Sequence, residues 1–199
     1  PSFGTPEGAW ATLAAGQLAR RYKLPYRSNG SLSSSNAPDA QAAYETMMSL
    51  WPAILAQANF IYQGAGWVEG GLTTSYEKLI IDVEALAMME ALLTGYEVND
   101  DTLALPYIDQ VGPGGHHFDT EHTLSRYSTA FYNPLISTRL QYANWVEAGS
   151  MDAAQRAYLK WKEVLKNYEK PKLDPAADEA LRDFVARRKR EQAGKALTA

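Results

Sequence analysis

The stretch of sequence that decides the fold is Asn59-Phe-Ile-Tyr-Gln-Gly-Ala-Gly-Trp-Val-Glu-Gly-Gly-Leu-Thr-Thr-Ser-Tyr-Glu77. Its short apolar run predicts a β-strand over 59–63, and the glycines that follow it predict a tight loop. Thr74 and Glu77 have the spacing of a capping box, which predicts that a helix begins at Thr74. In α/β folds ligands bind where strands end and helices begin, so this loop is a candidate ligand site.

Aromatic, amide and acidic side chains are concentrated in this segment, and they suit a cationic amine better than a phosphate because aromatic rings attract cations. We therefore predict a substrate-binding group that consists of Tyr62, Gln63, Trp67, Glu69 and Tyr76. An ordinary structural role competes with this interpretation at each position. Trp67 can serve core packing, Tyr62 can face a helix layer because strand residues alternate between faces, and Glu69 can cap a loop.

Helical and strand patterns alternate along the first half of the chain. Thr5 followed by Pro6 predicts a helix that runs to Tyr22. A strand is predicted at 24–28, and the helix opened by Asp39 has an apolar stripe that predicts a buried face, consisting of Tyr44, Met47, Met48, Trp51, Ile54 and Leu55. Beyond the helix that starts at Thr74, only helices are predicted, at 100–110 with Asn99 as its starting cap, at 151–168 and from 177 onward, with an aromatic-rich segment at 124–145.

Two strands that are each followed by a helix predict parallel strands joined by a crossover helix. Two strands alone do not make a stable sheet, so we expect further strands from outside this chain or from another subunit. The chain begins at Pro1 without Met, and its first residues read like an inner loop. We therefore expect a fragment of a longer protein.

The composition narrows the possible functional classes. The chain has 199 residues, a net charge of −4 and no cysteine, which excludes disulfides, thiolate metal sites and a cysteine nucleophile and fits a cytoplasmic protein. A nucleic-acid partner is not favoured, because the basic residues cluster only at Arg187-Arg-Lys-Arg190, a pattern typical of a solvated helix end. A membrane partner is not expected either, since no run of spanning length and no signal peptide are visible.

Several short blocks occur in a fixed order along the chain, among them Gly4-Thr-Pro-Glu-Gly-Ala9, Pro38-Asp-Ala-Gln-Ala42, Glu69-Gly-Gly-Leu-Thr73 and Val111-Gly-Pro-Gly-Gly-His116. In these blocks the chain resembles the C-terminal part of the trimethylamine methyltransferases. The resemblance spans residues 1–123 and continues more weakly to the last helix. It implies an α/β fold in which 1–123 form the C-terminal part of a (β/α)8 TIM-type barrel and 124–199 form a helical extension packed on that barrel.

The resemblance also implies an activity. Enzymes of this family pass a methyl group from a methylated amine to a cobalt corrinoid carried by a separate protein, so this chain itself is expected to bind no cofactor. Archaeal members carry a pyrrolysine that would fall in the polar loop at 30–36, where this chain has Gly30, Ser31 and Ser33. We therefore expect a non-pyrrolysine member, similar to a glycine betaine methyltransferase, that acts on a quaternary amine and forms a homo-oligomer.

Further contacts with the substrate follow from the same expectation. The nucleophile would be reduced cobalt, so the protein has to hold the cation, aim one methyl group and exclude water. Glu7 and His116 complete the predicted substrate-binding residues, and a substrate carboxylate would be received by His116, Arg27 or a backbone amide. A metal site at His116, His117 and His122 is not predicted, because adjacent histidines point apart and no i,i+4 pair occurs on a helix.

A function from a different class stays open beside the enzyme. The chain can be a non-catalytic half-barrel, a binding or scaffold module that pairs with another subunit, since it shows no protein nucleophile and has only two predicted strands. Whether the isolated chain keeps any activity is equally open. Under either interpretation the isolated fragment is expected to expose apolar barrel edges and to self-associate.

Overall fold

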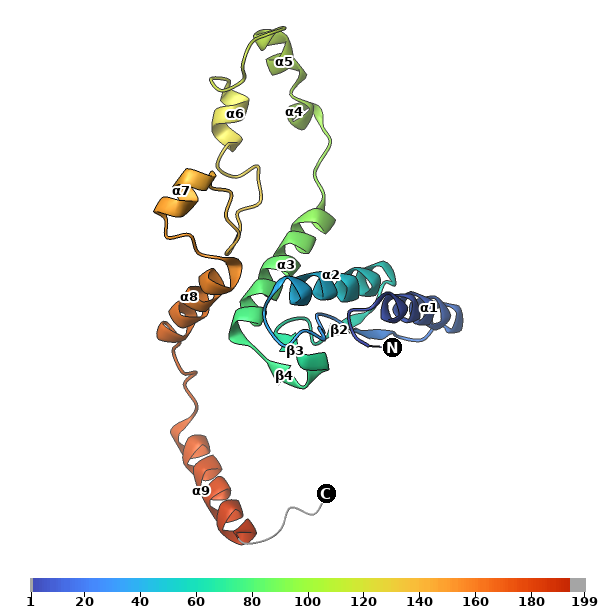
Figure 1. Ribbon diagram of the computed structural model, residues 1–199, viewed down its shortest axis with the longest axis vertical. Helices are drawn as coiled ribbons and strands as arrows, with labels where there is room; N and C mark the ends of the chain where they lie inside the picture. The colour runs from blue at the N-terminus through green and yellow to red at the C-terminus, as the bar shows by residue number, and fades with distance from the viewer. Residues whose placement is uncertain (1, 194–199) are drawn as a thin grey trace. The chain divides into compact units, whose positions relative to one another are not determined.

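A computed structural model describes residues 2–193 of the chain (Figure 1). The chain divides into two compact units, Pro1–Glu163 and Val164–Ala199. The first unit contains the strands and most of the helices, and the second contains α9 (Pro175–Gln192), whose basic last turn is exposed. The helix-rich α/β character expected from the sequence is thus confirmed. The predicted boundary between 123 and 124 concerns the arrangement of a whole barrel and stays a prediction.

The parallel pairing predicted from the βα order is confirmed. Strand β1 (Arg27–Asn29) pairs in parallel with β2 (Phe60–Tyr62), and Asn29 lies opposite Tyr62. The crossover between them is α2 (Ala40–Leu55), with Asp39 as its N-cap. The strand predicted at 24–28 begins later than expected, because the Leu24 amide still bonds to Ala19 at the end of the preceding helix and Pro25 has no N–H for a ladder.

Helices α1 (Pro6–Tyr22) and α2 lie side by side (Figure 1). Their approach is close because Gly16 faces Ala56: a Cβ built on Gly16 would lie 2.7 Å from the Ala56 Cβ and carbonyl oxygen. Arg20 closes the same end of the contact by donating to the Ala56 carbonyl. Small residues therefore set the distance between these two helices.

The prediction that the apolar stripe is the buried face of α2 was wrong. Tyr44, Met48 and Leu55 are exposed and the other three stripe residues are half-buried, whereas the buried apolar positions Leu50 and Ala53 lie outside the stripe. The buried side of α2 also carries polar residues, Glu45 and Thr46, because this side faces a network of hydrogen bonds instead of an apolar layer. Large side chains of the stripe therefore stay in contact with solvent within the described residues, Tyr44 and Leu55 most of all.

The tight loop predicted for the glycine-rich stretch occupies only its first part, and the rest is a small hairpin that the sequence did not predict. Strands β3 (Trp67–Val68) and β4 (Thr73–Thr74) pair antiparallel around η1 (Glu69–Gly71). The helix that follows, α3 (Tyr76–Thr94), begins one residue later than expected. Its N-cap is Ser75, which accepts from the Lys78 amide, because Thr74 is used in the ladder of β4.

The region after α3 consists of shorter helices than predicted. The expected helix at 100–110 is split into α4 (Asp100–Leu103) and α5 (Leu105–Val111), because Ala104 is left-handed. In the aromatic-rich segment, helix forms only at its two ends, as α6 (Glu121–Arg126) and α7 (Tyr142–Glu147). Helix α8 (Ala153–Lys166) follows as predicted. Within residues 2–193, no helix has the length and apolar character needed to cross a membrane.

Two acidic residues of α3 attach the later segments to the first half of the chain. Glu84 is buried and accepts hydrogen bonds from the Tyr132 hydroxyl and from the Ile136 and Ser137 amides. Glu77 accepts from the Trp161 indole of α8 at 2.8 Å. Between these anchors Ile80, Ile136 and Ala157 form a small apolar cluster. The core of this region therefore depends on a few carboxylates as well as on apolar packing.

Replacing Glu84 with glutamine should lower the free energy of unfolding at pH 7 by about 1–2 kcal/mol, because a charged acceptor of three hydrogen bonds is lost. Burial alone would raise the pKa of Glu84, but the hydrogen bonds from Ile136, Tyr132 and Ser137 lower it below its ordinary value. The contribution is therefore present above the ordinary glutamate pKa of about 4.3 and is lost as the pH falls through the lower folded value.

Urea denaturation of the wild type, Glu84→Gln and Glu90→Gln at pH 7 and at acidic pH checks this prediction. Glu90 lies on the same helix but is exposed, so its variant should match the wild type. The deficit of Glu84→Gln should shrink in acid. An equal deficit at both pH values would contradict a role for the ionised carboxylate.

Candidate functional site

Two loops run side by side beyond the carboxyl ends of β1 and β2. We call residues 30–36 the serine loop and residues 63–71 the glycine loop. The Gly30 amide donates to the Tyr62 carbonyl at 2.7 Å, and the Ser31 amide donates to the Gln63 carbonyl at 3.0 Å. Gly30 permits this approach because a Cβ there would lie 2.8 Å from the Gly64 Cα. The pairing of the strands thus continues into the loops.

A second pair of backbone hydrogen bonds joins the far ends of the two loops. The Glu69 amide donates to the Ser35 carbonyl, and the Gly70 amide donates to the Ser33 carbonyl, both at 2.8 Å. The serine loop is therefore held along its whole length against the glycine loop. The ordering comes from backbone groups, which are insensitive to the identity of most side chains.

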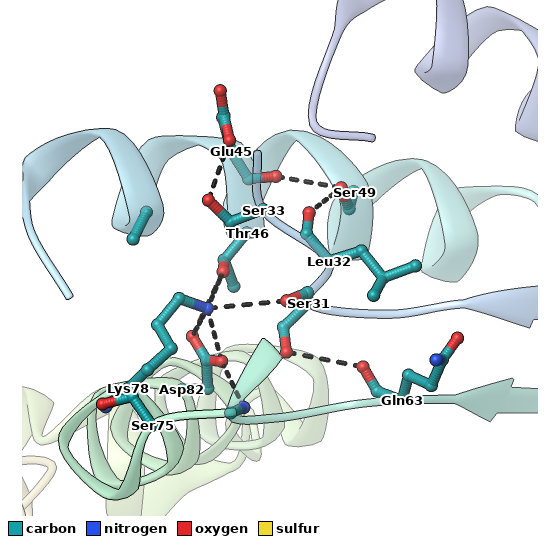
Figure 2. Close-up of polar contacts among 12 residues, drawn as sticks. Ser31, Leu32, Ser33, Glu45, Thr46, Ser49, Gln63, Ser75, Lys78 and Asp82 are labelled. Atoms are coloured by element: carbon teal, nitrogen blue, oxygen red, sulfur yellow. Dashed lines mark hydrogen bonds and ion pairs between the residues drawn. The ribbon is translucent and has the colours of Figure 1, made fainter. Parts of the chain in front are cut away.

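Glu45 of α2 fixes the middle of the serine loop (Figure 2). Its carboxylate accepts from the Ser33 hydroxyl at 2.8 Å, from the Ser34 amide at 2.6 Å and from the Gln41 side chain at 2.9 Å. Burial raises the pKa of Glu45, but the hydrogen bonds from Gln41, Ser33 and Ser34 outweigh it and hold that pKa below its usual value. The carboxylate is therefore ionised at neutral pH.

A buried ion pair lies beneath both loops. Lys78 and Asp82 of α3 are fully buried, and the Lys78 Nζ lies 2.7 and 2.6 Å from the two Asp82 oxygens (Figure 2). The Lys78 Nζ also donates to the Thr46 hydroxyl at 2.7 Å and reaches the Ser31 carbonyl at 3.5 Å. Burial lowers the pKa of Lys78, and the adjacent Asp82 opposes this effect.

Sequence reasoning missed this ion pair. The only sequence signal was a lysine four residues before an aspartate on a predicted helix, which usually marks an exposed pair. Its burial is set by Thr46 and Ser31, which lie far away in the sequence. Glu45 was missed for the same reason, because its partners Ser33 and Ser34 lie outside its own helix.

Tyr62 lies on the face of the sheet that the helices leave uncovered. Arg27 and Tyr62 are exposed and Asn29 is half-buried, whereas Ser28 between them in β1 is buried. The Arg27 guanidinium lies 4.6 Å from the centre of the Tyr62 ring. The Asn29 Oδ1 is buried and accepts no hydrogen bond from the described residues. Arg27 begins β1, and its guanidinium reaches Tyr62 at the carboxyl end of β2, so Arg27, Asn29 and Tyr62 form a polar and aromatic group on this face.

The other predicted residues of the glycine loop have different neighbours. The Gln63 carbonyl accepts hydrogen bonds from the amide and the hydroxyl of Ser31 in the serine loop. Glu69 accepts from the Thr73 hydroxyl at 2.7 Å, which is a local contact inside the hairpin. Trp67 and Tyr76 line a cavity of about 330 Å³, and Tyr76 stacks on Trp161 with ring centres 4.9 Å apart. Trp67 and Tyr76 are therefore brought together, while Tyr62 does not line that cavity; the substrate-binding roles stay predictions.

Glu7 and His116 lie at exposed positions. Glu7 is in the first turn of α1, where an acid complements the helix dipole. His116 follows α5 and lies 3.9 Å from Asp119. His122 bonds to the Asp101 carbonyl and packs near Tyr107. Among the described residues, no group of three or more His, Asp or Glu side chains is placed so that it could hold a metal ion.

Comparisons with known proteins identify relatives along nearly the whole chain. The family model for trimethylamine methyltransferases matches residues 1–193. A glycine betaine methyltransferase of Desulfitobacterium hafniense (strain Y51) is 40% identical over 190 residues, which cover 96% of this chain and 40% of that protein. A trimethylamine methyltransferase of Methanosarcina barkeri is 39% identical over 174 residues, which cover 86% of this chain and 34% of that protein. The chain thus spans 40% or less of the length of these relatives.

Proposed function

The chain belongs to the trimethylamine methyltransferase family, whose relatives act on methylated amines, and we propose that the whole protein moves a methyl group from a quaternary amine to a corrinoid on a partner protein. The observation that carries this proposal is the family match over residues 1–193 together with 40% identity to a glycine betaine methyltransferase. The cytoplasm, where reduced cofactors persist, is the compartment that we propose.

We further propose that β1 and β2 belong to a (β/α)8 barrel. The parallel pair β1–β2 with its crossover helix is the repeating unit of such a barrel. Both loops of the site follow the carboxyl ends of these strands, where barrel enzymes carry their active sites. Large apolar side chains that are exposed here, including Phe60 and Leu55, support a larger assembly that covers them.

The packing of the serine loop supports a non-pyrrolysine member of the family. Ser31, Leu32 and Ser33 are fully buried. Ser33 bonds to Glu45, and a Cβ on Gly30 would already collide with Gly64. A long side chain at these positions would have to displace the glycine loop. Because this loop differs from that of the pyrrolysine enzymes, the substrate that we propose is a quaternary amine instead of trimethylamine.

The reaction breaks one C–N bond of a quaternary ammonium, and the bonding electrons stay on nitrogen to leave a neutral tertiary amine. The acceptor corrinoid, a second substrate, supplies the electron pair for the new bond to carbon. The residues of this chain therefore have to bind, orient and desolvate the cation. Aromatic side chains at the strand ends suit this role, since each cation–π contact contributes about 0.5–2 kcal/mol depending on desolvation.

The group formed by Arg27, Asn29 and Tyr62 supports a substrate that carries a carboxylate as well as an ammonium. Arg27 already lies over the Tyr62 ring, so its guanidinium is oriented at the strand ends. Arginine binds carboxylates in a bidentate manner that fixes their direction. We propose that Arg27 receives the carboxylate of a betaine and so aims its ammonium end.

Replacing Arg27 with glutamine in the full-length protein should raise KM for glycine betaine about 10-fold or more, the loss expected for a charge-assisted hydrogen bond. Choline carries the ammonium but no carboxylate, so its inhibition constant should stay within about 3-fold of the wild-type value. The matched control is Arg21→Gln, which removes an exposed arginine outside this group and should change neither constant.

Steady-state transfer with reduced corrinoid and a panel of glycine betaine, carnitine, proline betaine, choline and trimethylamine provides both constants and tests the proposed function. Equal losses for glycine betaine and choline in Arg27→Gln would refute the role of Arg27. If the folded wild type transferred a methyl group from none of these amines, the proposed enzymatic function would be refuted. The alternative, a non-catalytic half-barrel that pairs with another subunit, would then be favoured by the exposed apolar side chains and the two-stranded sheet.

A further inference from the structure

One ion pair contacts both loops of the candidate site. Lys78 reaches the Ser31 carbonyl at the start of the serine loop, and Asp82 accepts from the Gly66 amide of the glycine loop at 2.8 Å. Thr46 of α2 bridges the pair, because its hydroxyl accepts from Lys78 and donates to Asp82. The three side chains come from two helices and meet next to Ser31 (Figure 2).

We infer that Lys78 and Asp82 are a positioning pair for the proposed reaction, which fixes the joined serine and glycine loops to α3. This inference rests on the proposed function for the reaction that it serves. The geometry itself does not depend on that function, since every contact is with Ser31, Gly66 or Thr46.

Stability alone does not account for the pair. Two charges buried in a protein interior lose their hydration, and a well-packed apolar pair of similar size is often as stable. An apolar pair can neither accept a hydrogen bond from the Gly66 amide nor donate one to the Ser31 carbonyl. Gly66 has a φ of +91°, a conformation that only glycine adopts readily, and it directly precedes Trp67. A shift of Gly66 would therefore carry Trp67 with it.

The two loops have separate supports on the helices. Glu45 holds the serine loop at Ser33 and Ser34, but it has no bond to the glycine loop among the contacts of residues 2–193. Lys78 and Asp82 are the side chains that connect both loops to one point. Loss of this pair should leave the backbone hydrogen bonds between the two loops in place and weaken the attachment of both loops to α3 at Ser31 and Gly66.

The double variant Lys78→Met/Asp82→Val in the full-length protein tests the inference. Methionine and valine remove both charges with a small change of volume, so the denaturation midpoint should fall far less than when Lys78 alone is replaced by methionine. Hydrogen exchange should accelerate by about 10-fold or more at residues 31–36 and at Gly66, and remain unchanged elsewhere. Because the loops are misplaced and the fold is intact, kcat should fall about 100-fold with KM changed far less.

A milder pair of variants keeps the test valid if the double variant does not fold. Thr46→Val removes the bridging hydroxyl at nearly constant volume, and Thr46→Ser restores it. Faster loop exchange in Thr46→Val that Thr46→Ser rescues would support the inference.

The inference would be overturned by a folded variant without the pair in which hydrogen exchange at both loops and kcat match those of the wild type. Failure of the proposed function gives a different result. The wild type would then transfer no methyl group, while the accelerated loop exchange would still show that the pair positions the loops.

Discussion

Replacement of Lys78 alone by methionine is expected to lower the free energy of unfolding by about 3–5 kcal/mol. The substitution leaves the Asp82 carboxylate fully buried without its cation, and breaking a buried pair at one partner carries a cost of this size. The Thr46 hydroxyl would also lose a donor at 2.7 Å. Because most domains are stable by only about 5–15 kcal/mol, this variant should be close to unfolding at moderate temperature.

The matched control is the same substitution at an exposed pair. Lys160 lies 3.1 Å from Glu163 on α8, with a partly exposed side chain. Such pairs contribute about 0–1 kcal/mol, so Lys160→Met should be nearly neutral. Urea denaturation followed by circular dichroism measures both variants. Equal effects of the two substitutions would mean that the Lys78 pair is hydrated in solution.

Replacement of Gly16 by leucine should cost about 3 kcal/mol, at the upper end of what overpacking costs. Helix propensity alone would favour the substitution by about 0.8 kcal/mol, since glycine is a poor helix former. The packing effect has the opposite sign and is larger. The first added carbon would lie 2.7 Å from the Ala56 Cβ and carbonyl oxygen, and the backbone of α2 cannot give way without moving the helix.

Ala14→Leu separates these two effects. Ala14 is on the same helix but exposed, and leucine is almost as good a helix former as alanine. Its unfolding midpoint in urea should therefore match that of the wild type. A stabilised Gly16→Leu would contradict the close approach of α1 and α2, because propensity would then dominate.

Local signals in the sequence predicted the element ends well. Thr5, Asp39 and Asn99 are N-caps in the structure as their residue types indicated. Each of these caps joins residues only three positions apart, so short-range chemistry decides them. The parallel pairing of β1 and β2 was predictable too, because a helix between two short strands leaves few other connections.

The start of α3 shows where such reasoning fails. Thr74 and Ser75 are both good N-cap residues, and the Thr74–Glu77 spacing favoured the wrong one. Glu77 bonds to the Trp161 indole, 84 residues later in the sequence, and Thr74 pairs with Trp67. Contacts at long range therefore decided which residue caps the helix.

The candidate site was predictable in its location but not in its arrangement. The glycine pattern indicated a site at the strand ends. The face of the sheet on which Tyr62 lies could not be predicted without the strand register, which places Tyr62 opposite Asn29. The grouping of Trp67 with Tyr76 around one cavity could not be predicted without the hairpin. Lys78 and Asp82 resembled a surface pair in the sequence, because nothing in α3 itself shows that Thr46 and Ser31 cover them.

The central claim is that the whole protein moves a methyl group from a quaternary amine to a corrinoid. It is tested most directly by incubating the full-length protein with ¹³C-methyl glycine betaine and reduced cobalamin and following both products by NMR. The account predicts labelled methylcobalamin and dimethylglycine in equal amounts. Formation of neither product by the folded protein, with glycine betaine or with any other methylated amine, would contradict it.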